Sequence, residues 1–508
     1  MNKIIPKPVK VTQRKGKFIL DKDTAIFCDS KCEKLAKLFK EMVEKLLSFE
    51  IPIFNIESNE DFPSMIILQL SDELNSSKDE SYLLNIEKSK IMILASNPVG
   101  IFYAIQSLRQ LIFNRNEIKD SNMNAISVRS MEIEDYPRFE WRGFMLDESR
   151  HFFGKEIVKK ILNEIAYLKI NKFHWHLTDD QGWRIEIKKY PKLNEVGSKR
   201  KGTRKSRRIG SDGIPVSGFY TQEELREIVE YARERFIEVI PEIDVPGHTT
   251  SALASYPELS CTGGKFKVRQ SFGIFKDVLC VGKEKVFEFV EDVFKEVSSV
   301  FTSEYFHFGG DEVPTKRWKK CPDCQERMKE HGFQDERELQ IYFTNRISQY
   351  LNSLEKIPIG WNEILNDKLT NIAVCQYWND NFDLVLKHAR NGRKIIMSEA
   401  ETVYLNYPYK ATPLQQTYFY DPVPSELEKN YHDNILGIEA CLWTEYIAND
   451  DRLEYQLYPR ILAIAEIGWT PKINKNFNDF KKRLKSYYEW FAVSKINAAS
   501  FGEATNQN

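Results

Sequence analysis

The chain has 508 residues, and its 73 basic and 74 acidic side chains leave a formal net charge of −1. This balance argues against a surface built to bind nucleic acid or anionic lipid. No apolar run reaches the roughly 18 residues that a membrane span needs, so we expect no membrane partner. With 32 Phe, 23 Tyr and 9 Trp, the composition also excludes disorder. Residues 1–7 lack the apolar stretch of a secretory signal. We therefore expect a cytoplasmic protein, or a secreted one whose signal has been removed.

Residues 1–135 have the pattern of a small mixed α/β domain. Short apolar stretches at 24–27 and 65–70, bounded by polar turns, predict strands. Amphipathic patterns predict helices over 31–48 and 98–114. This segment holds no combination of polar residues that suggests chemistry, so we interpret it as a support domain.

From residue 136 to 508 the pattern changes to short apolar strands that alternate with helices, which is typical of parallel βαβ units. Strands are predicted at 140–147, 172–178, 238–245, 305–312, 356–363, 373–378, 394–399 and 437–443. Helices are predicted near 154–169, 221–235, 283–298, 335–354, 381–391 and 454–468, whereas 400–436 carries no clear helix. Eight such units close naturally into a barrel. The predicted fold class is α/β, with a C-terminal (β/α)₈ TIM barrel preceded by a smaller α+β domain.

Polar and aromatic residues gather at the predicted C-terminal ends of the barrel strands, where barrel enzymes hold their active sites. They are Asp147, Arg150, Asp179, Asp180, Asp244, His248, Asp311, Glu312, Trp361, Trp378, Tyr404, Trp443 and Glu445. Helix capping explains individual members but not the whole set. Aromatic faces pack on sugar rings while carboxylates and arginine bind hydroxyls, so the set indicates a carbohydrate site.

The most suggestive pair for glycosidic cleavage is Asp311 and Glu312, but the two are adjacent in sequence. Consecutive residues of a strand point to opposite faces, so this pair would not straddle a sugar ring as two glycosidase carboxylates do. Neighbouring carboxylates also raise each other's pKa, which suits a group that must donate a proton near pH 7.

Several motifs together resemble the family 20 glycoside hydrolases, the β-N-acetylhexosaminidases. They are RGFMLDESRHFF (142–153), HWHLTDDQGWRIEI (174–187), PEIDVPGHTTSAL (241–253), HFGGDEV (307–313), IGWNEIL (359–365), QYWND (376–380), YLNYPY (404–409) and LWTEYI (442–447). The resemblance spans about 136–475 in family order, and the N-terminal unit resembles the α/β domain that precedes the barrel in this family.

The resemblance implies retaining hydrolysis in which the 2-acetamido group of the substrate is the nucleophile. Glu312 would protonate the glycosidic oxygen and then activate water. Asp311 would orient the acetamido nitrogen and stabilise the oxazolinium intermediate. Tyr404 would bind the acetamido oxygen. The substrate would be a glycan with a terminal β-linked N-acetylhexosamine, with GlcNAc and GalNAc both open, and no cofactor or metal is implied.

The remaining roles also follow from the resemblance alone. Three indoles would enclose the acetamido methyl and press its carbonyl toward the anomeric carbon; they belong to Trp361, Trp378 and Trp443. Arg150 would hold the 3- and 4-hydroxyls, and Glu445 the 4- and 6-hydroxyls. Asp179 and His248 would form a supporting dyad behind the acid, with Asp244 nearby.

Two positions depart from the family pattern. Asn406 stands where many members carry Asp, which removes a negative charge at the outer edge of the sugar site and leaves tolerance of 6-substituted or anionic sugars open. Asn362 occupies the third position of a motif that is commonly GWDE, and we interpret it as a residue that supports the site from behind.

Two other functions compete with hydrolysis by this mechanism. A non-catalytic sugar-binding barrel would have lost its acid, yet Glu312 is present. A metal-dependent amidohydrolase is suggested by His174 and His176, but such barrels carry this HxH pair on the first strand, and here it falls on the second.

Eight cysteines in 508 residues are too few for a disulfide scaffold. Cys321 and Cys324 have zinc-knuckle or redox spacing, but no second CxxC or His pair completes a site. We therefore expect a solvent-facing turn there, or a labile disulfide in an exported protein. Cys261 and Cys280 lie in one loop and would pair outside the cell. The run 199–208 carries seven basic residues and is interpreted as a solvated loop, with attraction of anionic glycans as the alternative.

Overall fold

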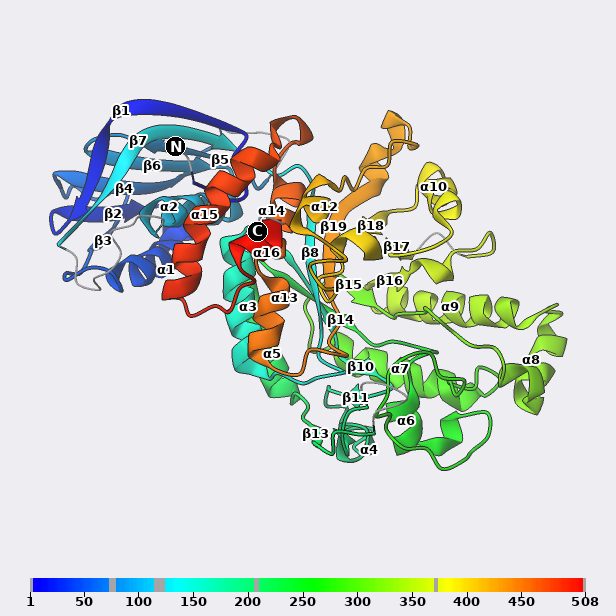
Figure 1. Cartoon of the computed structure of the whole chain (residues 1–508). Coiled ribbons are helices and arrows are strands. Elements are labelled where there is room, and N and C mark those ends of the chain that lie inside the picture. Colours follow the sequence, from blue (N-terminus) through cyan, green and yellow to red (C-terminus); the bar gives the residue numbers. More distant parts are fainter. Residues whose placement is uncertain (1–2, 73–78, 114–123, 205–209, 370–372, 506–508) are drawn as a thin grey trace.

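The computed structural model describes residues 3–72, 79–113, 124–204, 210–369 and 373–505. It consists of an N-terminal sheet domain beside a closed barrel (Figure 1). The predicted fold class is thereby confirmed. None of the helices in the described part of the chain is long and apolar enough to cross a membrane.

The N-terminal domain is a seven-stranded sheet in the order β1-β7-β5-β6-β4-β2-β3. Its strands are β1 (Lys10–Asp21), β2 (Thr24–Cys28), β3 (Ile53–Asn55), β4 (Ser64–Leu70), β5 (Tyr82–Ile86), β6 (Lys90–Ala95) and β7 (Ala125–Asp135). Helices α1 (Glu33–Glu44) and α2 (Pro98–Phe113) bury the apolar stripes that the sequence predicts. The predicted elements of this domain are present, and residue 114 lies outside the described residues.

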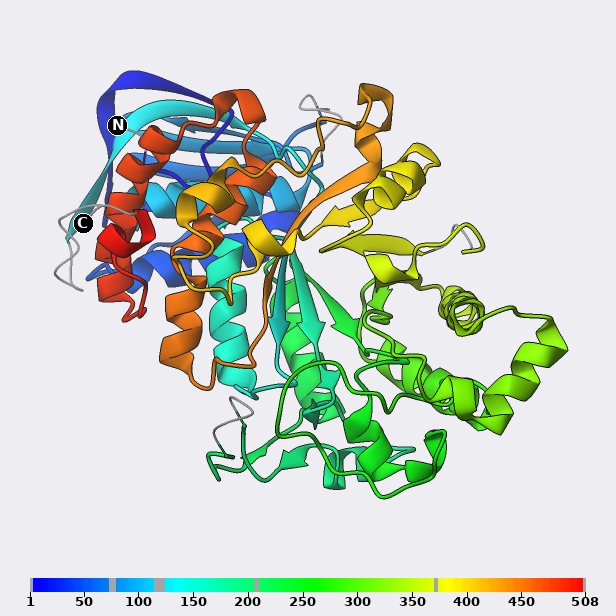
Figure 2. The same cartoon turned by 45° about the vertical axis from the view of Figure 1, so that its right-hand side comes forward.

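The barrel strands are all parallel and close in chain order, with the last strand paired to the first. They are β8 (Trp141–Asp147), β9 (Lys172–His176), β14 (Glu238–Glu242), β15 (Tyr305–His307), β16 (Ile357–Trp361), β17 (Val374–Tyr377), β18 (Ile395–Met397) and β19 (Ile435–Leu442). All eight predicted strands are found. Figure 2 shows them at the centre of the barrel domain, with helices around them.

The predicted helices between the strands correspond to α3 (Lys155–Tyr167), α5 (Gln222–Arg233), α7 (Glu284–Ser298), α9 (Glu336–Ser353) and α10 (Phe382–Arg390). The single helix predicted over 454–468 is wrong. Two helices stand there, α13 (Asp450–Leu457) and α14 (Arg460–Trp469), because Pro459 lacks the N–H that would continue the first. The stretch 400–436 contains two short helices, α11 (Ala400–Val403) and α12 (Leu414–Phe419).

Short elements decorate the loops at the C-terminal ends of the barrel strands. They are β10 (Thr178–Asp179), β11 (Gly182–Trp183), α4 (Lys192–Glu195), β12 (Lys199–Arg200), β13 (Val216–Ser217), α6 (Thr250–Ser255) and α8 (Pro322–His331). The basic run 199–208 is only partly a solvated loop, since Arg200 is buried and donates to the hydroxyl of Thr203. Residues 205–208 of this run lie outside the described residues.

The C-terminal helices α15 (Phe477–Val493) and α16 (Phe501–Thr505) return toward the N-terminal domain. In Figure 1, α15 runs in red beside the blue sheet domain. Its Tyr487 hydroxyl donates to the side chain of Gln110 on α2. The chain therefore closes on itself, and helix α15 contacts the first domain.

A buried ion pair joins the two domains. Lys169, in the loop before β9, has no exposed surface, and its Nζ lies 2.8 Å from Oδ2 of Asp135 at the end of β7. The hydroxyl of Tyr82 and the indole of Trp469 also donate to this carboxylate. Every lone pair that faces the interior thus has a donor, which a buried charge requires.

Asp135→Ala should cost about 3–5 kcal/mol in the free energy of unfolding, because it leaves the Lys169 ammonium buried without a counter-ion. Glu134→Ala is the matched control, since Glu134 pairs with Lys10 at the surface and such pairs contribute at most about 1 kcal/mol. Urea denaturation of both variants measures the difference. Equal losses would contradict the role of the buried pair.

Candidate active site

A cavity of about 520 Å³ opens at the C-terminal ends of the barrel strands. It is lined by Arg150, His248, Asp311, Glu312, Trp361, Trp378, Tyr404, Asn406, Tyr407, Pro408, Trp443, Glu445, Tyr446, Ile447, Arg452 and Gln456. Of the residues predicted at the strand ends, all lie in this lining except Asp147, Asp179, Asp180 and Asp244. These four are buried, so Asp179 lies behind the cavity and not among the groups that line it.

The loop that carries Asp311 and Glu312 differs from the predicted strand. β15 ends at His307, and the chain turns through left-handed backbone at Gly309, Gly310 and Glu312, with φ of +70°, +92° and +49°. The expectation that the two carboxylates point to opposite faces is therefore wrong, because they do not belong to a strand. Both reach the same cavity.

Asp244 explains why glycine is needed in this turn. The amide of Gly310 donates to Asp244 Oδ1 at 3.3 Å, and a Cβ on Gly309 would lie 1.9 Å from the same oxygen. Burial, and then the charge of Asp311, raise the pKa of Asp244 well above its usual range. The backbone of the turn thus rests directly on a buried carboxyl.

A chain of charged groups runs behind the cavity. Arg150 Nη2 lies 2.5 Å from Asp179 Oδ2, and Asp179 Oδ1 lies 3.3 Å from Nδ1 of His248. Burial opposes the ionisation of Asp179, but Arg150 and His248 hold its pKa well below the usual range. On its other side, His248 Nε2 lies 3.5 Å from Glu312 Oε2 and 3.8 Å from Asp311 Oδ2. The predicted dyad of Asp179 and His248 is therefore in place behind the carboxylate pair.

Asp311 has an unusual electrostatic environment. Burial raises its pKa to about 6, with the charge of His248 opposing the rise and those of Glu242 and Glu312 adding to it. Its Oδ1 is buried and accepts no hydrogen bond from any residue that the structure describes. The site therefore holds a strong acceptor beside the cavity that has no donor among the described residues.

Aromatic rings form the inner wall of the cavity. The ring centroids of Trp361 and Trp443 lie 5.8 Å apart, those of Tyr404 and Trp443 6.2 Å, and those of Trp378 and Tyr404 6.2 Å. The indole of Trp361 donates to the buried carboxylate of Glu242 and that of Trp378 to the partly buried carboxylate of Glu363, which fixes their orientation. The four rings leave an apolar corner next to Asp311, and burial raises the pKa of the Tyr404 hydroxyl, so it stays protonated as a donor.

The two departures from the family pattern take different places. Asn362 accepts from the amide of Trp378 at 3.0 Å and donates to the carbonyl of Asn379 at 2.7 Å, so its amide side chain positions the loop that carries an indole. An aspartate could accept here but not donate. Asn406 lines the cavity itself, and its side-chain oxygen is buried with no partner among the described residues.

Some residues of the site were not predicted. Glu363 accepts from the Trp378 indole at 2.9 Å, and burial, together with the charge of Asp311, raises its pKa to about 7. Glu363 is the last residue of the GWNE motif, and its place in that motif is the sequence signal that could have identified it. The residues of the cavity lining that were missed are Tyr407, Pro408, Tyr446, Ile447, Arg452 and Gln456. The last two come from α13, a helix with no motif that could have drawn attention.

The HxH pair that suggested a metal-dependent enzyme lies in the barrel interior, where both histidines contact buried carboxylates. His174 Nδ1 contacts Glu439 Oε1 at 2.7 Å and its Nε2 lies 3.1 Å from Glu242 Oε2. His176 lies between Glu242 and Asp179, at 2.5 Å and 3.2 Å. Neither histidine lines the cavity, so the pair serves to hold buried carboxylates in position.

A closed (β/α)₈ barrel whose rim brings carboxylates, an arginine and four aromatic rings around one cavity has the form of a glycoside hydrolase. The description "Glycosyl hydrolase family 20, catalytic domain" matches residues 139–472, and "Glycosyl hydrolase family 20, domain 2" matches residues 1–136. The chain belongs to glycosyl hydrolase family 20.

Individual relatives agree with the family assignment. A β-hexosaminidase of Porphyromonas gingivalis is 42% identical over 493 residues, which cover 95% of this chain and 62% of that protein. A β-hexosaminidase of Vibrio furnissii is 34% identical over 92% of this chain and 77% of its own length. The structure of an exo-β-N-acetylglucosaminidase of Vibrio harveyi, in complex with N-acetylglucosamine, has a TM-score of 0.86 at 29% identity and covers 98% of this chain and 78% of that one.

Gly309→Ala should abolish most of the activity, because the new Cβ would collide with Asp244 and displace the turn that carries the two carboxylates. Gly332→Ala is the control: its φ of +68° is nearly the same, but the space around it is open. The control should lose only the roughly 1–2 kcal/mol that left-handed backbone costs a residue with a Cβ, with kcat/KM unchanged. Equal effects of the two substitutions on kcat/KM would contradict this account.

Proposed function

We propose that the protein hydrolyses terminal β-linked N-acetylhexosamine residues from glycans, with retention of configuration and with the acetamido oxygen of the substrate as nucleophile. The observation that carries the proposal is the buried, unpartnered Oδ1 of Asp311 beside an apolar corner of aromatic rings. An acetamido group matches both features, because its N–H supplies the missing donor and its methyl group fits the corner.

In the first step, the acetamido carbonyl oxygen attacks the anomeric carbon while the bond to the leaving oxygen breaks. Glu312, which lines the cavity with 30% of its side chain exposed, gives its proton to that oxygen. The product is an oxazolinium ion, whose positive charge the Asp311 carboxylate stabilises. In the second step, Glu312 takes a proton from water, which attacks the anomeric carbon and reopens the ring.

An internal nucleophile reacts rapidly when it is held in the geometry of attack, and the fixed positions of the surrounding groups provide this. Tyr404 donates toward the acetamido oxygen, and the walls formed by Trp361 and Trp443 restrict the group to the geometry of attack. Arg150 and Glu445 lie where the outer hydroxyls of the sugar would bind. The arginine is itself fixed by Asp179 and by the side chain of Gln181.

The outer edge of the cavity bears on which sugars are accepted. Asn406 and Arg452 both line it, and neither carries negative charge. This composition leaves room for 6-substituted or anionic sugars beside plain GlcNAc and GalNAc. A sugar-binding barrel without activity, the alternative that the sequence left open, would leave every aryl glycoside uncleaved by the unsubstituted protein.

Glu312→Gln should lower kcat by about 10²–10⁴ on substrates with poor leaving groups, and far less on nitrophenyl glycosides, which need no proton. Asp311→Asn should lower kcat by about 10²–10³ on both, because the intermediate loses its stabilising charge. A panel of aryl β-glycosides with and without the 2-acetamido group measures these effects. Glucosides cleaved as fast as N-acetylglucosaminides, or a sugar found by mass spectrometry on a protein side chain, would overturn the mechanism.

The activity should fall as the pH drops through about 6, because Asp311 acts as a carboxylate and its pKa is raised to about 6. His248→Gln removes a positive charge that lowers this pKa, so the acidic limb of kcat/KM should move to higher pH. His331→Gln, at an exposed position on α8, is the control and should leave the profile unchanged. A limb that stays in place or moves to lower pH in His248→Gln would contradict the assignment.

A further inference from the structure

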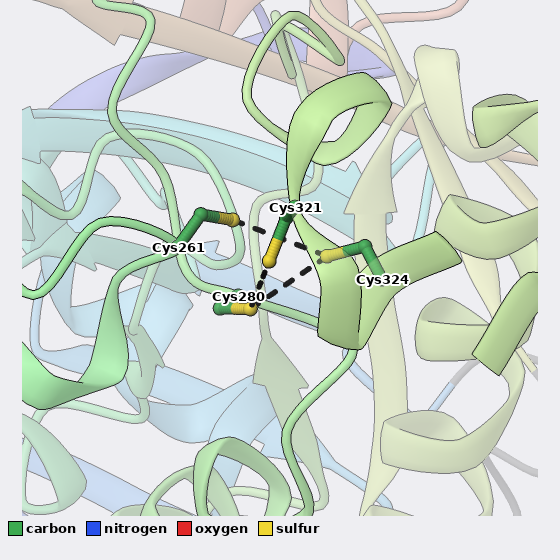
Figure 3. A group of neighbouring side chains, drawn as sticks. All are labelled: Cys261, Cys280, Cys321 and Cys324. Atoms are coloured by element: carbon green, nitrogen blue, oxygen red, sulfur yellow. Dashed lines mark hydrogen bonds between the residues drawn. The ribbon is translucent and has the colours of Figure 1, made fainter. Parts of the chain in front are cut away.

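Four cysteines that are far apart in the sequence meet in one place outside the cavity (Figure 3). The Sγ of Cys280 lies 3.4 Å from that of Cys321 and 3.6 Å from that of Cys324, and the Sγ of Cys261 lies 3.9 Å from that of Cys324. Cys280, Cys321 and Cys324 are at most 2% exposed, and Cys261 is partly buried. The prediction of a solvent-facing turn at Cys321 and Cys324 is therefore wrong.

The spacing of the sulfurs is that of a tetrahedral thiolate site. A zinc ion bound to four thiolates at about 2.3 Å sets its sulfurs about 3.8 Å apart, and the observed separations fall close to this value. A disulfide needs about 2.05 Å, and all eight cysteines of the chain are free thiols. The disulfide between Cys261 and Cys280 that the sequence suggested is absent, since both are free thiols and each also contacts Cys324.

The backbone delivers the four sulfurs from two directions. Cys261 and Cys280 follow neighbouring positions of an antiparallel bridge between Ser260 and Leu279, and the Cys280 amide donates to Leu259. Cys321 is the N-cap residue of α8 and Cys324 lies in its first turn, where backbone N–H groups favour negative charge. The two pairs thus converge from an isolated antiparallel bridge and from the N-terminal end of a helix.

Gly282 allows these two parts to approach each other. A Cβ at this position would lie 2.2–2.5 Å from backbone atoms of Asp323 and Cys324, so only glycine fits between the loop after β14 and the helix. The indole of Trp318, just before the helix, also donates to the carbonyl of Leu279 at 2.9 Å. Close backbone contact around four converging thiols is a built arrangement, not a chance cluster of side chains.

We propose that Cys261, Cys280, Cys321 and Cys324 bind one zinc ion in a structural, four-coordinate site. Binding displaces the thiol protons and fills every coordination position with protein sulfur, so the ion takes no part in the hydrolysis. None of the four cysteines lines the catalytic cavity. The inference does not depend on the proposed function.

The ion would fasten the long loop after β14 to the loop after β15. The first of these loops reaches the cavity rim, where the carbonyl of Ser271 accepts from Gln181 and the ring of Phe272 contacts Tyr446. The second loop begins with the two carboxylates of the active site. Asp277 adds a further link between them through Arg317, at 2.6 Å. Zinc would therefore stabilise two loops that have little secondary structure of their own.

The test is the metal content of the full chain, purified without chelators and measured by mass spectrometry of the elements. We expect about one zinc per chain, and X-ray absorption at the zinc edge should give four sulfurs at about 2.3 Å. Cys324→Ser should lose the metal, whereas Cys28→Ala, which removes a buried thiol of the N-terminal sheet, should keep it. Retention of zinc in Cys324→Ser would overturn the proposal.

A second measurement uses the unchanged protein, in case the variant fails to fold. Stripping zinc with a chelator should lower the Tm, and addition of zinc chloride to the reduced chain should restore it. Alkylation of the chain, denatured with chelator but without reductant, should modify all eight cysteines. Only four or six modified cysteines would show disulfides in place of the metal site, and a reduced chain that takes up no zinc would equally refute it.

Discussion

The carboxylate of Glu242 is buried at the end of β14. It contacts several side chains of the barrel interior, and their positions depend on it. It has no exposed surface, and it contacts His176 Nδ1 at 2.5 Å and accepts from Trp361 Nε1 at 2.9 Å. His307 Nδ1, which accepts from the amide of Gly309, lies 3.0 Å from it. Burial opposes its ionisation, but the charges of His176, His307 and His174 hold its pKa well below the usual range. A carboxylate this deeply buried stays ionised only when hydrogen-bond donors and positive charges surround it.

Two series of contacts connect this carboxylate with the residues of the site. Through the indole of Trp361 it fixes one aromatic wall of the cavity. Through His176 it reaches Asp179, which in turn holds Arg150 and His248. The groups that would touch the sugar therefore stand on a second layer of charges, and that layer is tied to the centre of the barrel. Preorganisation of this kind lets a few donors act on a developing charge without rearrangement.

Much of the fold and of the site could be predicted from the sequence, because the patterns that specify them are local in the chain. Alternation of apolar strands with helices gave the eight strands, and the end of each strand gave the side of the barrel on which Asp311, Tyr404 and Trp443 would lie. The conformation of the segments between strands and helices could not be predicted in this way. The turn at Gly309 and Gly310 is set by contact with Asp244, 65 residues or more away in the chain, so the strand was predicted too long. Glu242 escaped notice because an isolated glutamate in an apolar strand carries no periodic signal.

The cysteine cluster shows the same limit more sharply. Cys321 and Cys324 have a recognisable spacing, but their partners Cys261 and Cys280 are separated from each other and from the motif by loops without a pattern. Only the closure of the barrel brings the loop after β14 against the loop after β15, and only the absence of a side chain at Gly282 lets the backbones meet. A group of cysteines that comes from a loop and from a helix end is a property of tertiary structure. Short-range spacing rules are therefore bound to miss half of such a site, and they fail for the same reason at the catalytic turn.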